Sequence, residues 1–126
     1  MTGEQKKSYL KSYRVCMTEI GRIEEEIEDI KNHKEDSRRR EELAELLAKK
    51  RNDCARLCMD IIESIERMEG SDEYSLVLQK NLLVERYIRG KSWEEIEKIM
   101  SYQRTQLHRI HTKAIDNLVV QDTKIC

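Results

Sequence analysis

A heptad-spaced apolar stripe in the first quarter of the chain limits the possible folds more than any other sequence feature. Between residues 5 and 33 the stripe alternates steps of four and three, at Tyr9, Tyr13, Cys16, Ile20, Ile23, Ile27 and Ile30. A helix of this length would extend about 40–45 Å. Because so narrow a stripe is not stable alone in water, the spacing predicts a long helix packed against a partner helix.

The next segment supplies that partner. Residues 34–40 (KEDSRRR) contain no apolar side chain and predict a hairpin turn. Residues 38–69 then predict a second helix with its own apolar stripe, formed by Leu43, Leu46, Leu47, Cys54, Leu57, Cys58, Ile61, Ile62, Ile65 and Met68. The simplest arrangement is an antiparallel hairpin, with residues 20–30 near 43–47 and residues 9–16 near 61–68.

The second stripe is interrupted at Lys50 and broadens from Cys54 onward. A broad stripe predicts a second contact, either with the C-terminal part of the chain or with another subunit. The second alternative motivates the prediction of a two-fold homodimer formed through the hairpin.

The composition agrees with long helices exposed to water. Charged residues make up 39% and hydrophobic residues 38% of the 126 residues, with no proline and four glycines. No apolar run approaches the ~18–20 residues that a membrane span requires, and the N-terminus has no secretory signal. We therefore expect an all-α protein that is cytoplasmic, does not bind membranes and keeps its four cysteines reduced.

A short polar segment separates the hairpin from the rest of the chain. Gly70 can end the second helix, and Ser71 or Asp72 can cap the next one. This predicts two domains, a coiled-coil-like helical hairpin over residues 1–70 and a three-helix domain over residues 71–126. Its first helix, residues 73–89, is apolar on too wide a surface for one contact and should be the central support. Residues after about Val120 are expected to form a tail.

The last two helices have a capped start and a tight connection. Gly90 can end the preceding helix, and Ser92 and Glu95 have the S-x-x-E spacing of a capping box. The first helix should bury Trp93, Ile96, Ile99 and Met100, and the second Leu107, Ile110, Ala114 and Leu118. Residues 101–103 break the pattern between them, so the stretch predicts a helix-turn-helix.

The exposed face of the second helix suggests the function. No acidic residue occurs between Lys98 and Ile115, and base edges and phosphates are bound by side chains of the kind found there. The candidate DNA-binding residues are Lys98, Gln103, Arg104, Thr105, Gln106, His108, Arg109, Thr112 and Lys113. Among them, Arg104, Gln106 and Arg109 are expected to contact bases in a major groove of double-stranded DNA. Lys98 and Lys113 are expected to contact phosphates.

Two short motifs carry a resemblance to a known family. Trp93-Glu94-Glu95-Ile96 and Lys113-Ala114-Ile115, with Leu118 following, resemble region 4 of sigma-70-type factors over residues 72–118. With the hairpin, the chain is similar to phage-encoded late transcription regulators of the RinA/ArpU type. The resemblance implies regulation of phage transcription, as an activator acting near a promoter, with RNA polymerase as a second partner. Ser101 and Gln103 depart from the family pattern, which has a turn glycine and a Ser or Thr cap there.

Other functions have weaker support in the sequence. Cys54 and Cys58 have a spacing that can chelate a metal, but both are better explained as core residues, and we predict no metal site and no cofactor. Neither His108 nor His111 has a nucleophile or paired acid at a catalytic spacing, so we predict no enzymatic activity. Two alternatives remain open, a small terminase-like DNA-packaging protein and a coiled-coil adaptor that binds only protein.

Overall fold

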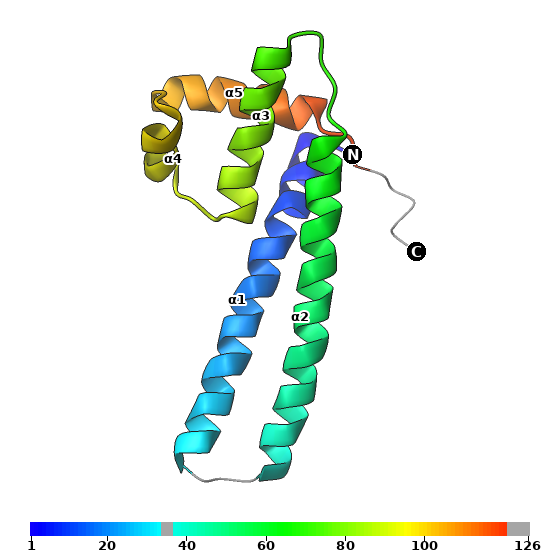
Figure 1. Ribbon diagram of the computed structural model, residues 1–126, viewed down its shortest axis with the longest axis vertical. Helices are drawn as coiled ribbons and strands as arrows, with labels where there is room; N and C mark the ends of the chain where they lie inside the picture. Colours follow the sequence, from blue (N-terminus) through cyan, green and yellow to red (C-terminus); the bar gives the residue numbers. More distant parts are fainter. Residues whose placement is uncertain (34–36, 121–126) are drawn as a thin grey trace.

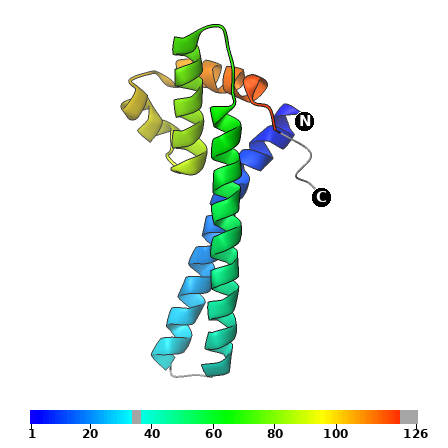
Figure 2. The same cartoon turned by 45° about the vertical axis from the view of Figure 1, so that its right-hand side comes forward.

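The computed structural model describes residues 1–33 and 37–120, and every regular element within these ranges is helical. The elements are α1 (Gly3–His33), α2 (Ser37–Glu66), α3 (Glu73–Leu83), the π-helical turn η1 (Val84–Ile88), α4 (Trp93–Met100) and α5 (Arg104–Asn117). The predicted all-α class is confirmed. α1 and α2 form a long rod of two helices, and α3, α4 and α5 gather at one end of it, near the N-terminus (Figures 1 and 2).

α1 and α2 pack antiparallel along their length. Cys16 and Ile20 of α1 meet Cys54 of α2 in the middle of the rod, with Tyr13, Met17, Leu47 and Leu57 around them. Ion pairs join the exposed edges, between Glu19 and Lys50, Glu24 and Arg51, and Glu26 and Arg39. Lys50, which interrupts the apolar stripe of α2, forms an ion pair with the Glu19 carboxylate. This contact lowers the pKa of Glu19.

The predicted turn over residues 34–40 is too long. Ser37–Arg40 belong to α2, where Arg38 and Arg39 pair with Glu42 at helical spacing. Residues 34–36 of the predicted turn lie outside the described residues. At its other end α2 stops at Glu66 rather than at residue 69.

Two of the cysteines form a disulfide, so the prediction of four reduced thiols is wrong. Cys16 and Cys54 are bonded, with their Cα atoms 5.7 Å apart, a usual distance for a disulfide. The sequence predicts that both are core residues, but heptad spacing alone does not show that two cysteines on different helices lie directly opposite each other. Cys58 is a free thiol, and Cys126 lies outside the described residues.

The base of the hairpin and the C-terminal helices share one hydrophobic core. Its buried residues are Leu10 of α1, Ile61 and Ile65 from the end of α2, Met68 just after α2, and Leu83, Tyr87, Ala114, Ile115 and Leu118 from the C-terminal part. The broad stripe after Cys54 therefore makes its second contact within the chain. The homodimer, which is predicted on hairpin surface left over after packing within the chain, stays a prediction.

α1 also contacts α5 directly, which the heptad pattern does not predict. Leu10 lies outside the predicted stripe, yet it is fully buried because the N-terminal turns of α1 pack on α5 and η1 as well as on α2. Lys6 donates hydrogen bonds from Nζ to the carbonyl oxygens of Ile115 (2.9 Å) and Asp116 (3.3 Å). The negative end of the α5 helix dipole also stabilises a positive charge at these last carbonyl oxygens.

The predicted helix over residues 73–89 is interrupted in its last turns. Asp72 caps α3 by accepting hydrogen bonds from the backbone N–H groups of Tyr74 and Ser75. From Val84 the backbone widens into η1, in which the Arg89 N–H donates to the carbonyl oxygen of Val84. Such π turns often mark functional sites, and this one carries Arg86, which lies over Trp93 of α4, and Tyr87, which hydrogen-bonds His111 of α5.

Candidate nucleic-acid interface

α4 and α5 are joined by a three-residue turn, as the sequence predicts. The capping box of α4 is present, because the Ser92 hydroxyl accepts from the Glu95 N–H (3.2 Å) and the Glu95 carboxylate accepts from the Ser92 N–H (3.1 Å). Hydrogen bonding of the Glu95 carboxylate by the backbone and the side chain of Ser92 lowers the pKa of Glu95. At the other end of α4, Ser101 adopts a left-handed conformation (φ 59°, ψ 39°). It is the one non-glycine residue with positive φ in the described chain. In the family that this stretch resembles, the same position is usually glycine.

One face of α5 is fixed by packing. Leu107, Ala114 and Leu118 are fully buried, as predicted, while Ile110 is half-buried. Leu107 packs against Leu82 of α3 and Ile96 of α4 in a third, small hydrophobic core. α5 is therefore held from three sides, by α1, α3 and α4.

α4 buries less apolar surface than the sequence predicts. Ile96 is fully buried with Trp93 and Met100 packed beside it, but Ile99 is 52% exposed. At 100° per residue, Trp93 and Met100 lie to one side of Ile96, whereas Ile99 lies about 60° to the other side. The helix is rotated so that its buried edge excludes Ile99.

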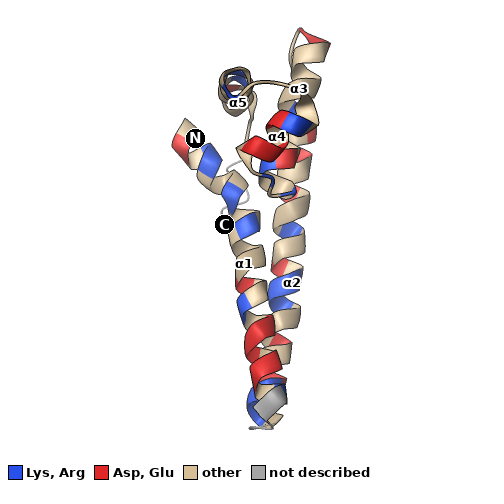
Figure 3. Cartoon of the chain, turned by 90° about the vertical axis from the view of Figure 1, so that its left-hand side faces the viewer, with Lys and Arg blue, Asp and Glu red and all other residues tan. Residues whose placement is uncertain are grey.

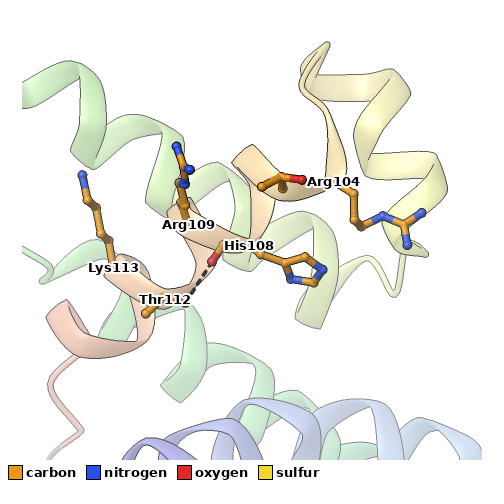
Figure 4. Close-up of a pocket in the computed structure, with 6 residues that line it drawn as sticks. Arg104, His108, Arg109, Thr112 and Lys113 are labelled. Carbon is orange, nitrogen blue, oxygen red and sulfur yellow. Dashed lines mark hydrogen bonds between the residues drawn. The ribbon is translucent and has the colours of Figure 1, made fainter.

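All nine predicted DNA-binding residues are exposed. Six of them line a shallow hollow of about 590 Å³ along α5, and none of its lining residues is acidic; they are Arg104, Thr105, His108, Arg109, Thr112 and Lys113. Arg109 and Lys113 extend from the same side of α5, whereas Arg104 extends toward α4 (Figure 4). The structure thus brings three cations and two hydroxyl groups onto the exposed half of α5.

Internal contacts distinguish these side chains from one another. Arg104 forms an ion pair with Glu97 of α4, an acid just before the acid-free stretch of the sequence. The Gln106 side-chain oxygen accepts from the Gln103 N–H (3.0 Å), and so helps to cap α5. By contrast, no hydrogen bond or ion pair joins the side chain of Arg109 or Lys113 to another described residue.

The two histidines of α5 have different environments. His108 is exposed, and its ring lies 4.9 Å from the Trp93 ring. His111 is buried, with Nε2 2.7 Å from the Tyr87 hydroxyl and its ring edge-on to Trp93. Burial, with the nearby positive charges of Lys7, His108, Arg86 and Lys11, lowers the pKa of His111 to about 4. His111 is therefore a neutral structural residue at pH 7, and only His108 is exposed at the surface of α5.

The described residues contain no cluster of three His, Cys, Asp or Glu side chains able to hold a metal ion. Within the same residues, no helix has both the length and the apolarity needed to cross a membrane. Comparisons with protein-family models, curated proteins and solved structures found no significant match to this chain.

Proposed function

We propose that this chain is a sequence-specific DNA-binding regulator of transcription whose reading element is α5. One observation carries the proposal: α5 is held by packing on one face and presents an exposed face without an acidic lining residue on the other. A supported α-helix fits the major groove of B-DNA, where each base pair presents a distinct pattern of donors and acceptors.

The distribution of charge supports a nucleic-acid partner more strongly than the net charge does. The formal net charge is −1, but many of the acids lie along the hairpin, where Glu19, Glu24 and Glu26 pair with cations. The exposed surface of α5 has Arg104, Arg109 and Lys113 against a single acid of that helix, Asp116. This local excess of positive charge is the property that attracts a phosphate backbone.

Arg109 is the side chain best suited to read a base. Its guanidinium group can donate two parallel hydrogen bonds to guanine O6 and N7, and no internal partner would have to be released first. Arg104 is already held by Glu97, so base contact by Arg104 would cost that ion pair. Lys113, a flexible point charge, would contact a phosphate, as would Lys98 of α4.

The resemblance of residues 72–118 to region 4 of sigma-70-type factors supports a more specific role. We propose regulation of phage genes near a promoter, with RNA polymerase as a second partner. In this arrangement α4 would cross the DNA backbone beside the groove that α5 enters.

Selection of bound fragments from a random DNA pool tests this function. The expected result is an enriched sequence element that the protein binds at least ~10³-fold more tightly than scrambled DNA. Pools that stay unenriched, together with binding that does not respond to salt, would contradict it and favour an adaptor that binds only protein. Sedimentation of the complex adds a second criterion, because a ring of many subunits would indicate a DNA-packaging protein instead.

A further inference from the structure

A second positively charged site lies where the hairpin meets the C-terminal helices. It is a pocket of about 230 Å³ lined by Lys11 and Arg14 of α1, Arg86 and Tyr87 of η1, and Gly90. Three of these five residues are cations and none is acidic. Lys11 and Arg14 are exposed, so the pocket is open to a ligand from outside.

The walls of the pocket are held by specific contacts. Arg86 donates from Nη1 to the carbonyl oxygen of Lys91 (3.0 Å), and its guanidinium carbon lies 4.9 Å from the centre of the Trp93 ring. The guanidinium group of Arg14 lies against the backbone at Gly90, where a Cβ would come within 2.7 Å of it. The positive φ of Gly90, 68°, is what favours glycine here, whereas the end of the flexible Arg14 side chain could move away from an added Cβ.

The cations of the pocket have little opposing charge. Residues 5–18 contain Lys6, Lys7, Lys11 and Arg14 and no acid, and no ion pair joins Lys11 or Arg14 to another described residue. Lys7, Lys11 and Arg14 recur at steps of four and three, so they follow one face of α1. Figure 3 shows the blue bands of α1 in the half that lies near α5, with one acidic band in the first turn, at Glu4, and the other acidic bands of α1 toward the far end of the hairpin.

The pocket adjoins the exposed surface of α5. Arg86 and His108 both contact the Trp93 ring, each at 4.9 Å, so one side chain separates the pocket from α5. α1 and η1, which carry the pocket cations, also pack directly against each other, and α1 packs against α5.

We propose that this pocket binds a phosphate group of the DNA backbone, next to the groove that α5 enters. The inference rests on the proposed function, and it assigns the N-terminal turns of α1 to the DNA-binding surface. Ammonium and guanidinium groups bind phosphodiesters without reading sequence, so the pocket would position α5 and contribute affinity rather than specificity.

The test compares two double variants in a salt series, using the DNA element selected from the random pool and a scrambled duplex. Lys11→Ala/Arg14→Ala removes the pocket cations. Arg22→Ala/Lys49→Ala is the matched control, because it removes the same two residue types from exposed positions elsewhere on the hairpin. Equal melting temperatures for both variants and the parent would exclude unfolding as the cause of any difference, and Arg14→Lys, which keeps the charge, provides a milder second variant.

The pocket variant should bind both duplexes more weakly by the same factor, and its salt slope should fall by about one for each phosphate that it no longer neutralises. Between roughly 50 and 200 mM salt, a slope smaller by one corresponds to about a fourfold smaller change in affinity. The control variant should behave as the parent does, and Arg14→Lys should retain most of the slope. Ethylation interference should show at least one phosphate that matters to the parent but not to the pocket variant.

The failures of the two proposals can be told apart. If the parent binds its selected element and the pocket variant matches it in affinity and salt slope, the pocket inference is wrong while the proposed function stands. Weaker binding to the selected element alone would also overturn the pocket as a phosphate site, because that result indicates an indirect effect on base contacts. If the parent binds no DNA, the proposed function fails and the inference fails with it.

Discussion

Replacing Ser101 with glycine should stabilise the protein. Ser101 ends α4 in the left-handed region, at φ 59°, where a side chain costs roughly 1–2 kcal/mol. Glycine removes that cost, but it also gives the unfolded chain more freedom, which offsets about 0.5–1 kcal/mol. Ser101 is exposed and its side chain makes no hydrogen bond within the described residues, so the substitution removes little else. The net gain should be about 0.5–1 kcal/mol.

Thermal melting followed by circular dichroism measures this gain. A chain of this size should melt roughly 2–5 °C higher in the Ser101→Gly variant. Ser8→Gly is the matched control, because Ser8 is an exposed residue within α1, and replacing serine with glycine there should cost about 0.5 kcal/mol. If Ser101→Gly lowers the melting temperature as Ser8→Gly does, the left-handed conformation assigned to Ser101 is wrong.

Three other predictions test the core, the buried histidine and the disulfide. Leu10→Ala should cost roughly 2–4 kcal/mol in urea unfolding, whereas Val15→Ala, at a 57% exposed position of the same helix, should cost little; equal costs would contradict the shared core. Because the folded-state pKa of His111 is about 4, against 6.5 unfolded, its neutral form contributes stability that is fully present above pH 6.5 and is lost as the pH falls toward 4, at most about 3 kcal/mol. His111→Gln should therefore show a smaller loss of stability than the parent between pH 7 and pH 4.5, and an identical pH profile would refute the assignment. Cys16 and Cys54 should resist alkylation until the disulfide is reduced. Reduction should destabilise the protein by up to roughly 4 kcal/mol, because the unfolded chain is then no longer constrained by the closed loop. Alkylation of both cysteines without reductant would contradict the pairing.

Local sequence patterns predict the helices of this protein better than they predict its contacts. The heptad spacing predicts α1 and its antiparallel partner, and the S-x-x-E spacing predicts the start of α4, because both are properties of residues close in sequence. The heptad stripe does not include Leu10, since the burial of Leu10 depends on α5, at the other end of the chain.

In the candidate DNA-binding surface, too, the local features were predictable and the contacts between helices were not. Seven of the nine predicted residues are exposed because the periodicity of α5 places them away from its buried stripe. The other two, Lys98 in α4 and Gln103 at the N-cap of α5, are exposed as well. The ion pair of Arg104 with Glu97 depends on how α4 is rotated about its axis, and the pocket cations of α1 depend on how the hairpin is docked. Neither rotation nor docking is encoded in local spacing, although the acid-free run of residues 5–18 is a readable signal for the second basic surface.

Binding of Arg109→Ala and Lys113→Ala to the selected element and to scrambled DNA, across a salt series, tests the central claim most directly. Both residues are exposed on the same face of α5 and neither has an internal partner in the described chain. Arg109→Ala should cost roughly 1–3 kcal/mol on the selected element and relax the preference at one base pair. Lys113→Ala should weaken both DNAs alike and lower the salt slope by about one. If Arg109→Ala instead weakens both DNAs equally, α5 holds the backbone and does not read sequence, and if neither variant changes binding, α5 is not the DNA-binding helix.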